Sequence, residues 1–383
     1  MTNAPARKPH LILLSPHNPK DLRAWSGTFF YAYSALQELD PDIIWVDATV
    51  ADAINRALIK IARKIGIKEA FTASKAFSYF ASLECRLRLL FKKGDAIVAI
   101  TASTHVYALK TSRPIIFVSD ATYACISIMY ESYFAALPQW LRDNGNAVER
   151  AALKRSRHIL YASEWARSSA IHDYGIPASA ITVMPLGPNI DSEIIDRFKT
   201  VKSADFSRGV RLLFVSADWK RKGGAVVLDL KRNLQARGIP CELFLVGTSD
   251  PSLQSENGVH VLGRLDKSNP DQLMTLCTQY EQAHFLVLPT SAEAFGVVFS
   301  EAQAFGCPSL TYAVGGTTTA VKDGETGFTL PLGASAVQYA DIIVSLVNDP
   351  ARYEAMSIGC RRRYETEANW RVWAQKVMEL AAL

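Results

Sequence analysis

The sequence lacks the short motifs that mark several common classes of enzyme and metal protein. It has no HExxH or paired-histidine spacing, so a metal site is not expected. Neither a Walker A sequence nor a GxSxG elbow is present. There is also no zinc spacing or RNP-type motif, so we expect no nucleic-acid partner.

Long apolar runs and paired cysteines are missing too. No apolar stretch approaches the roughly 18 residues that a membrane-spanning helix needs. The apolar segment Leu11 to Leu14 near the N-terminus is too short for a signal-peptide core, so we expect a cytoplasmic protein. The 6 cysteines form no CxxC pair, and most stand in apolar surroundings. We therefore expect reduced core thiols and no disulfide framework.

What is present is ordinary for a globular chain of two domains. The 383 residues include 49% hydrophobic and 21% charged residues. These proportions exclude intrinsic disorder, collagen and a coiled-coil rod. A chain of this length buries about three quarters of its surface, so it needs no disulfide or metal to hold its core.

Positive charge is concentrated in one segment. The net charge is +5, yet residues 56–93 contain ten basic and two acidic side chains interleaved with apolar ones. A basic amphipathic helix can lie on an anionic membrane surface. One interpretation is therefore that residues 56–93 bind such a surface. A helix pair with one core-facing side and one solvated basic side explains the pattern equally well. The sequence leaves both interpretations open.

Short apolar runs alternate with longer helical patterns along the whole chain. Uninterrupted apolar runs are typical of strands covered on both faces, and their alternation with helices predicts parallel sheets. We expect two series of such strands, and hence two Rossmann-like halves. The predicted strands are 10–15, 43–48, 96–100, 115–119, 158–162 and 180–184, followed by 211–216, 242–247, 259–263, 285–289 and 308–312.

A segment rich in turn formers, residues 185–193, separates the two series. We expect an N-terminal domain over 1–187, a C-terminal domain over 188–366 and an amphipathic helix over 367–383. Ligands of open α/β sheets bind beyond the carboxyl ends of the strands. Two facing sheets would therefore hold a ligand in the cleft between them.

The most informative segment is SAEAFGVVFSEAQAFGCPSL, residues 291–310. Glu293 lies in a turn after a predicted strand, and Glu301 lies eight residues later in a helix that starts near Gly296. At about 1.5 Å per residue, the two carboxylates would lie roughly 10 Å apart. That span approximates the distance from the hexose to the ribose of a nucleotide sugar. Alternatively, Glu293 caps the helix and Glu301 is a solvated surface residue.

The chain resembles the retaining glycosyltransferases of family 4, which have the GT-B fold. EAFGVVFSEAQAFGCP looks like the E-x7-E motif of that family. The resemblance extends to four further segments. These are SPHNPKDLRAWSGTFFYAYSAL (15–36), ASEWARSSAIHDYGIPASAITVMPLGPNID (162–191), RLLFVSADWKRKGG (211–224) and VGGTTTAVKDGETGF (314–328). It implies two Rossmann-like domains facing across a cleft, with the last helix crossing back to the N-terminal domain.

The resemblance assigns roles to residues of the C-terminal half. Glu293 is expected to contact the donor sugar near the reacting carbon, Glu301 to bind the ribose diol, and Lys222 to neutralise the leaving diphosphate. The backbone N–H groups of Phe295 and Gly296 are expected to help hold the sugar.

This sequence departs from relatives in the same half. Ala217 stands where many relatives have an arginine for the diphosphate, so Arg221 or Lys220 would have to replace it. Thr319 stands where many relatives have a glutamate. Gly263 and Arg264 occupy the position at which relatives meet the nucleobase; Arg264 could equally be a surface residue.

Two candidates come from the N-terminal half. Gly27, in WSGT, would let the first loop approach the diphosphate or the reacting sugar, or it is an ordinary turn glycine. Asp120, after a predicted strand, would lie near the acceptor, or it caps the next helix.

We therefore expect a retaining glycosyltransferase that moves a hexosyl unit from a UDP- or GDP-sugar to a hydroxyl of a glycan or lipid-linked acceptor. Members of the family usually act in cell-surface polysaccharide or lipopolysaccharide synthesis, so the resemblance implies that setting. We expect the protein to be cytoplasmic and peripheral on the inner face of the membrane. No cofactor and no metal are expected, since such enzymes use protein cations and helix ends. A nucleotide-sugar epimerase of similar architecture, or a membrane-binding module with a vestigial sugar site, are the alternatives.

Overall fold

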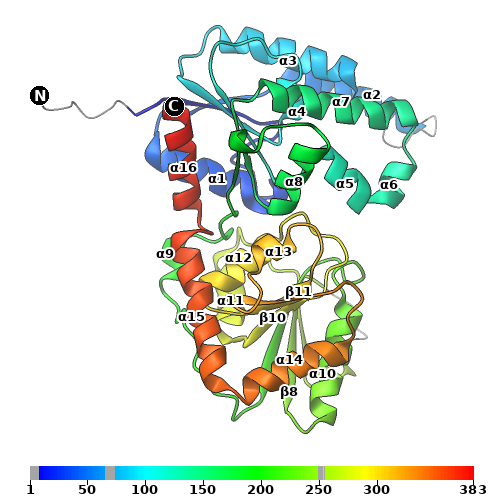
Figure 1. The fold of residues 1–383 in the computed structure, drawn as a ribbon, viewed down its shortest axis with the longest axis vertical. Helices are drawn as coiled ribbons and strands as arrows, with labels where there is room; N and C mark the ends of the chain where they lie inside the picture. Colours follow the sequence, from blue (N-terminus) through cyan, green and yellow to red (C-terminus); the bar gives the residue numbers. More distant parts are fainter. Residues whose placement is uncertain (1–7, 65–73, 249–252, 254) are drawn as a thin grey trace, which may run out of the picture. The chain divides into compact units, whose positions relative to one another are not determined.

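The chain forms two compact units in the computed structural model, which describes residues 8–64, 74–248, 253 and 255–383 (Figure 1). The first unit comprises residues 1–184 and 370–383, and the second comprises residues 185–369. Each unit contains a six-stranded sheet whose strand pairs are all parallel. The predicted α/β fold class with two Rossmann-like halves is therefore confirmed.

The sheet of the first unit has the order β2-β1-β3-β4-β5-β6. Its central strands are buried along their whole length, as their uninterrupted apolar runs predict. The strands are β1 Leu11–Leu14, β2 Ile44–Val46, β3 Ala96–Ile100, β4 Ile115–Ser119, β5 His158–Tyr161 and β6 Ile181–Val183.

Helices cover this sheet, and one of them comes from the far end of the chain. α16 (Trp370–Ala382) packs against α1 (Thr28–Leu39) and touches β3 and β4 (Figure 1). Trp373 and Val377, which face the core as the amphipathic pattern predicts, are buried. The other helices of the unit are η1 Ala24–Gly27, α2 Thr49–Lys64, α3 Lys75–Leu89, α4 Ser103–Val106, α5 Tyr123–Met129, α6 Glu131–Ala135, α7 Gln139–Arg155, α8 Glu164–His172 and η2 Ala178–Ala180.

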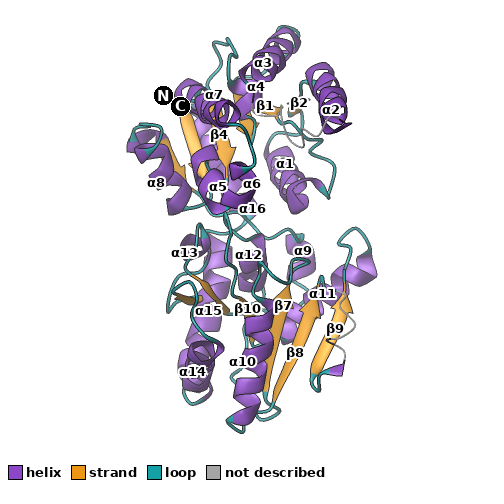
Figure 2. Ribbon diagram, turned by 90° about the vertical axis from the view of Figure 1, so that its right-hand side faces the viewer, coloured by secondary structure: helices purple, strands orange, loops and turns teal. Residues whose placement is uncertain are grey.

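The sheet of the second unit has the order β12-β11-β10-β7-β8-β9. α10 lies across β7 and β8 (Figure 2). The strands are β7 Val210–Val215, β8 Cys241–Val246, β9 Val259–Gly263, β10 Phe285–Leu288, β11 Ser309–Tyr312 and β12 Gly327–Leu330, and the helices are α9 Ser192–Ile195, α10 Gly224–Ala236, α11 Pro270–Gln282, α12 Val297–Ala304, α13 Thr317–Ala320, α14 Ala336–Val347 and α15 Pro350–Thr366.

One strand of this sheet, β12, was not predicted from the sequence. β12 is only four residues long and begins with a glycine, so it carries too little apolar pattern to stand out. Gly327 has φ +149°, and a Cβ there would lie 1.9 Å from the carbonyl oxygen of Ser309 on β11. The glycine is therefore needed for the two strands to pair.

Two further expectations can be compared with the structure. All 6 cysteines are free and buried, which confirms the prediction of reduced core thiols. Within the described residues, no helix combines the length and apolar character needed to cross a bilayer.

Candidate functional site

An ion pair between Lys222 and Glu293 lies at the carboxyl ends of two neighbouring strands in the second unit. Lys222 is in the loop after β7, and Glu293 is in the turn after β10. Their side chains are only 11% and 14% exposed. Burial lowers the pKa of Lys222, whereas the nearby Glu293 carboxylate opposes that shift. The pair thus places one cation and one anion, both largely dehydrated, at the edge where α/β proteins bind ligands.

A glycine allows the two loops to come this close. Gly223 follows Lys222, has φ +75°, and would place a Cβ 2.3 Å from the carbonyl oxygen of Pro289. The loops are also joined by a hydrogen bond of 2.9 Å from the N–H of Ser291 to the carbonyl of Arg221. The first glycine of the RKGG segment is therefore required for the contact between the two loops.

Arg221 supports the turn that carries Glu293. Its guanidinium donates to a carboxylate oxygen of Asp218 and to the carbonyl of Ala292, each at 2.8 Å. Those contacts occupy the side chain that was expected to replace the missing arginine at Ala217. Lys220, the other predicted substitute, is exposed.

The turn leads directly into α12. Phe295 is buried, and Gly296 caps the helix in a left-handed conformation, φ +88°, without a side-chain hydrogen bond. The carbonyl of Glu293 accepts the N–H of Gly316 at 3.1 Å, which ties the Gly-Gly loop to the same turn. Thr319, the departure from relatives in that loop, offers its carbonyl to the guanidinium of Arg363.

Replacing Gly296 with alanine should disturb the Glu293 turn specifically. A Cβ at this position would lie 2.6 Å from the ring of Phe299 and 3.2 Å from Cγ of Glu293. Gly333 is a matched control, because it has φ +87° with nothing within 4 Å of a Cβ. Both alanine variants should lose about 1 kcal/mol of stability through the left-handed backbone, and Gly296→Ala should lose more because the buried ring of Phe299 must shift. We expect a further loss of ligand affinity at the Glu293 site, measured by calorimetry, only in Gly296→Ala; equal behaviour of the two variants would contradict this.

Glu301 is held by a second lysine. Its side chain, on α12, is 2% exposed; one carboxylate oxygen pairs with Lys267, and the other accepts the hydroxyl of Tyr280 at 2.9 Å. Lys267 also donates to the carbonyl of Asn189 at 3.3 Å. The interpretation of Glu301 as a solvated surface residue is therefore wrong.

Sequence reasoning missed Lys267 and Tyr280. Gly263 ends β9 and Arg264 is exposed, but Lys267, three residues further on, is the residue of this loop that pairs with Glu301. Tyr280 lies on α11 and is fully buried, so its hydroxyl needs a partner, and burial raises its pKa well above the usual value. The one available signal was the helical spacing of four residues that are buried on α11, namely Leu273, Leu276, Cys277 and Tyr280.

The two predicted residues of the first unit lie at the ends of its elements: Gly27 is the last residue of η1, and Asp120 comes directly after β4. Gly27 follows Trp25 and Ser26, and all three have positive φ, of 49°, 57° and 92° in chain order. Left-handed backbone at two non-glycine residues is strained and concentrates at functional loops. Asp120 directly follows β4, and the next helix, α5, is capped by Thr122, so the interpretation of Asp120 as that cap is wrong.

The second unit matches a known family. Residues 197–363 match the family described as Glycosyl transferases group 1. The D-inositol 3-phosphate glycosyltransferase of Thermomonospora curvata is 34% identical over 128 residues, which are 33% of this chain and 29% of that protein. The matched regions span 20% and 19% of the next two relatives, so the chain covers well under two thirds of their length.

Solved glycosyltransferases share the architecture of the whole chain. WaaG, described as a glycosyltransferase involved in lipopolysaccharide biosynthesis, is similar with a TM-score of 0.61 and 14% identity, over 97% of this chain and 99% of that one. Anabaena HepE in complex with UDP is similar with a TM-score of 0.64 and 16% identity, over 98% and 100%. The chain therefore has the GT-B fold, and its residues 197–363 match the group 1 glycosyl transferases, in agreement with the resemblance seen in its sequence.

Proposed function

We propose that this chain is a retaining glycosyltransferase of the family 4 type, which transfers a hexosyl unit from a UDP- or GDP-sugar to a hydroxyl of a glycan or lipid-linked acceptor. The observation that carries the proposal is the pair of buried carboxylate–lysine contacts, Lys222–Glu293 and Lys267–Glu301, on the carboxyl side of one parallel sheet. The Anabaena neighbour binds UDP in its crystal structure, which supports a nucleotide donor.

In this proposal, donor binding exchanges the partners of Lys222. The diphosphate carries more negative charge than a single carboxylate, so the Lys222 ammonium group pairs with the diphosphate. Hydroxyls of the donor sugar then replace Lys222 as the partners of Glu293. Charge that develops on the leaving diphosphate is then stabilised by Lys222 and by the N-terminus of α12. The acceptor hydroxyl attacks from the face that the diphosphate leaves, and a phosphate oxygen takes its proton. We further propose that Gly27 lets the first loop approach the diphosphate or the reacting sugar, and that Asp120 lies near the acceptor. The reaction proposed here requires no divalent cation and no cofactor.

Glu301 binds the ribose diol, and Lys267 and Tyr280 position its carboxylate. Glu301→Ala should weaken binding of the nucleoside diphosphate about 10- to 100-fold, because hydrogen bonds to a charged group are lost. Lys267→Ala should weaken it less, and Lys267→Arg should restore it. Calorimetry with UDP and GDP measures these affinities, after a thermal-shift screen of UDP, GDP, ADP and their sugars has identified the base. Affinity for that nucleotide unchanged in Glu301→Ala would contradict the ribose role.

The setting we propose is cell-surface polysaccharide or lipopolysaccharide synthesis, on the cytoplasmic side of an anionic membrane. WaaG, with which the chain shares its fold, is described as acting in lipopolysaccharide biosynthesis. The concentration of positive charge in residues 56–93 supports a peripheral position on the membrane.

A further inference from the structure

Large hydrophobic side chains are exposed in one region of the first unit. Of the nineteen that are exposed among the described residues, ten lie between Val50 and Phe91. Contiguous apolar patches of this kind mark contact surfaces for a protein or a membrane. The ten are Val50, Ile54, Leu58, Ile61, Tyr79, Phe80, Leu83, Leu87, Leu90 and Phe91.

Their spacing makes one outward-facing stripe on each of two helices. On α2, Val50, Ile54, Leu58 and Ile61 recur every three to four residues and are 46–59% exposed. On α3, the exposed positions between Tyr79 and Leu87 share one side, while Ala81, Cys85 and Leu89 face the core. We call these two stripes, with Leu90 and Phe91, the apolar ridge.

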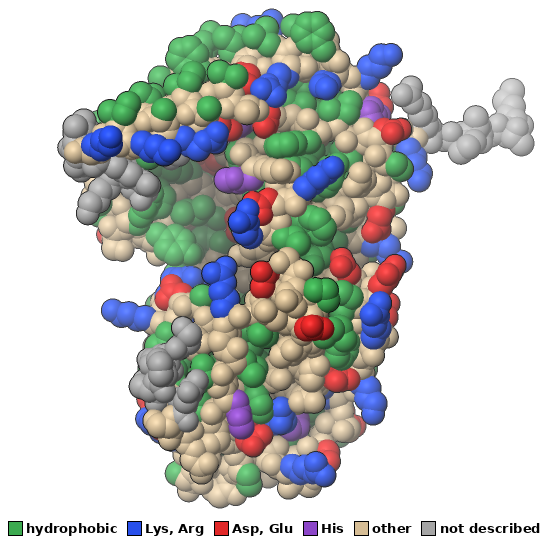
Figure 3. Space-filling model, turned by 180° about the vertical axis from the view of Figure 1, so that it is seen from behind, with side chains coloured by type: hydrophobic (Ala, Val, Ile, Leu, Met, Phe, Trp, Pro, Cys, Tyr) green, Lys and Arg blue, Asp and Glu red, His purple; other side chains and the backbone are tan. Residues whose placement is uncertain are grey.

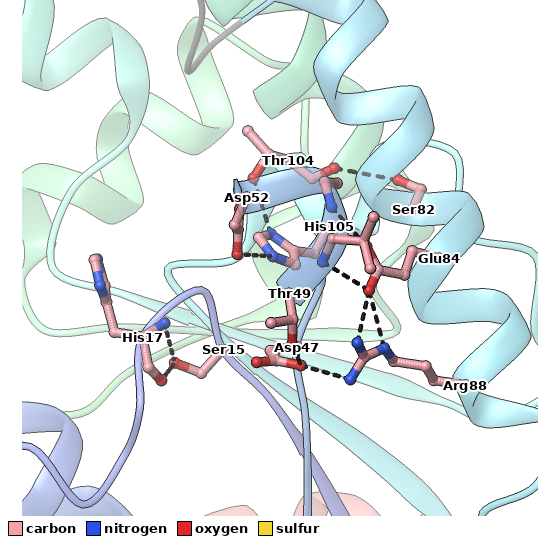
Figure 4. A network of polar contacts seen from close by, with 12 residues as sticks. Ser15, His17, Asp47, Thr49, Asp52, Ser82, Glu84, Arg88, Thr104 and His105 are labelled. Atoms are coloured by element: carbon pink, nitrogen blue, oxygen red, sulfur yellow. Dashed lines mark hydrogen bonds and ion pairs between the residues drawn. The ribbon is translucent and has the colours of Figure 1, made fainter. Parts of the chain in front are cut away.

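The two helices are joined by polar contacts, so the ridge is one surface. The Glu84 carboxylate on α3 accepts the N–H groups of Val50 at 3.1 Å and Ala51 at 2.8 Å, and thereby caps α2 (Figure 4). Arg88 joins Glu84 to Asp47 with hydrogen bonds of 2.7 and 2.9 Å. Two helices, α2 and α3, thus lie in this basic segment, while residues 65–73 lie outside the described residues.

Exposed positive charge accompanies the ridge. The acidic side chains among the described residues of 49–93 are Asp52 and Glu84, and both are half-buried. An oxygen of the Asp52 carboxylate lies 3.8 Å from Nε2 of His105, and Glu84 makes the contacts given above. Figure 3 shows hydrophobic side chains gathered on the upper part of this unit, with a line of Lys and Arg side chains below them. The exposed basic residues are Arg56, Lys60, Lys64, Lys75, Arg86, Lys92 and Lys93.

We propose that the apolar ridge docks on an anionic phospholipid bilayer, with its hydrophobic side chains inserted among the acyl chains and the basic residues against the headgroups. The proposal deepens the function proposed above, on which it rests for its setting. The charge argues for this occupant: a second copy of the chain would bring two positive surfaces together, whereas an anionic bilayer offers both an apolar interior and negative charge. The helices lie in the interface and do not span it, consistent with their length and composition.

Co-sedimentation with vesicles of 70% phosphatidylcholine and 30% phosphatidylglycerol tests the proposal. The combined change Ile54→Ser, Leu58→Ser and Ile61→Ser should lower the partition coefficient at least about tenfold. Reversing Arg56, Lys60 and Lys64 to glutamate should lower it at least about 100-fold at low salt, since each charge contributes about fivefold. The matched control Leu332→Ser, Val337→Ser and Ile358→Ser changes side chains of similar exposure in the second unit, and should bind as wild type.

A labelling experiment keeps the proposal testable if the serine variants fold poorly. Because the native cysteines are buried, Leu58→Cys can be labelled selectively with an environment-sensitive fluorophore, and Val337→Cys serves as its control. The label at 58, and not at 337, should shift to the blue on these vesicles. Two results would overturn the proposal. One is that the serine variant binds the vesicles as strongly as wild type does. The other is that the serine changes abolish self-association of the chain and leave vesicle binding intact. Affinity for the nucleotide, measured by calorimetry, should not change in any of these variants; its absence in wild type would instead refute the donor site.

Discussion

Replacing Lys222 with methionine should reduce the rate of donor cleavage, as kcat/KM, about 100- to 1,000-fold. The magnitude is that of removing one preorganised group that stabilises charge in a transition state. Methionine preserves the length and apolar stem of the side chain but leaves Glu293, 14% exposed, without its cation. The measurement is release of the nucleoside diphosphate from the donor sugar. Lys199→Met, which removes an exposed lysine elsewhere in the second unit, should behave as wild type.

The pH dependence distinguishes a direct role of Lys222 from a structural one. Burial lowers the pKa of Lys222, so its ammonium group loses its proton at a lower pH than that of an ordinary lysine. Affinity for the diphosphate should therefore decline on the alkaline side earlier than for an exposed lysine. In Lys222→Arg the guanidinium keeps its charge, and the decline should disappear. Turnover near that of wild type in Lys222→Met would refute the assignment.

The sequence predicted the architecture well because the strands are uninterrupted apolar runs. Strands such as β3 and β4 are buried at every residue, which explains their uninterrupted apolar runs, and the helices between them dictate parallel pairing. β12 was missed because its position depends on the pairing of Gly327 with β11, and four residues carry no such information. The pattern is strongest where burial is complete and weakest at sheet edges.

The candidate site was predictable only where residues are close in sequence. Glu293 and Glu301 share one strand–turn–helix segment, and the glycines after Lys222 marked its loop. Lys267 meets Glu301 across 34 residues, and the contact depends on how the loop after β9 folds over α12. No spacing rule links the two positions. The exposed stripes of α2 and α3 had a visible period, yet only the structure showed which of their faces is buried.

Glu149 in the first unit is a buried acid that no sequence pattern singled out. It lies on α7, is 5% exposed, and accepts a hydrogen bond of 2.5 Å from the hydroxyl of Ser103. Burial raises the pKa of Glu149 to about 7, although the Ser103 hydrogen bond opposes the shift. The native state therefore keeps a proton that the unfolded chain, with an ordinary pKa of 4.5, releases.

This difference should make the first unit less stable as the pH rises. Below pH 4.5 Glu149 is protonated in both the native and the unfolded state, so it does not change the free energy of unfolding with pH. Between pH 4.5 and about 7 Glu149 ionises only in the unfolded state, and the free energy of unfolding falls by up to about 3 kcal/mol. Glu149→Gln should therefore be more stable than wild type above pH 7 by up to about 3 kcal/mol. Below pH 4.5 the variant should match wild type. Urea unfolding at several pH values, followed by tryptophan fluorescence, measures the difference.

The comparison must be made between variants, because His284 of the second unit changes stability in the opposite sense. Burial lowers the pKa of His284 to about 4, so its contribution is lost as the pH falls from 6.5 towards 4, and the wild-type profile combines both effects. Glu38→Gln, a change at an exposed carboxylate of the same unit, is the control and should leave the profile unchanged. Ser103→Ala should extend the loss of stability to higher pH, since it removes the hydrogen bond that favours the ionised form. A Glu149→Gln variant that differs from wild type by the same amount at every pH would show that Glu149 is ionised in the native state at neutral pH.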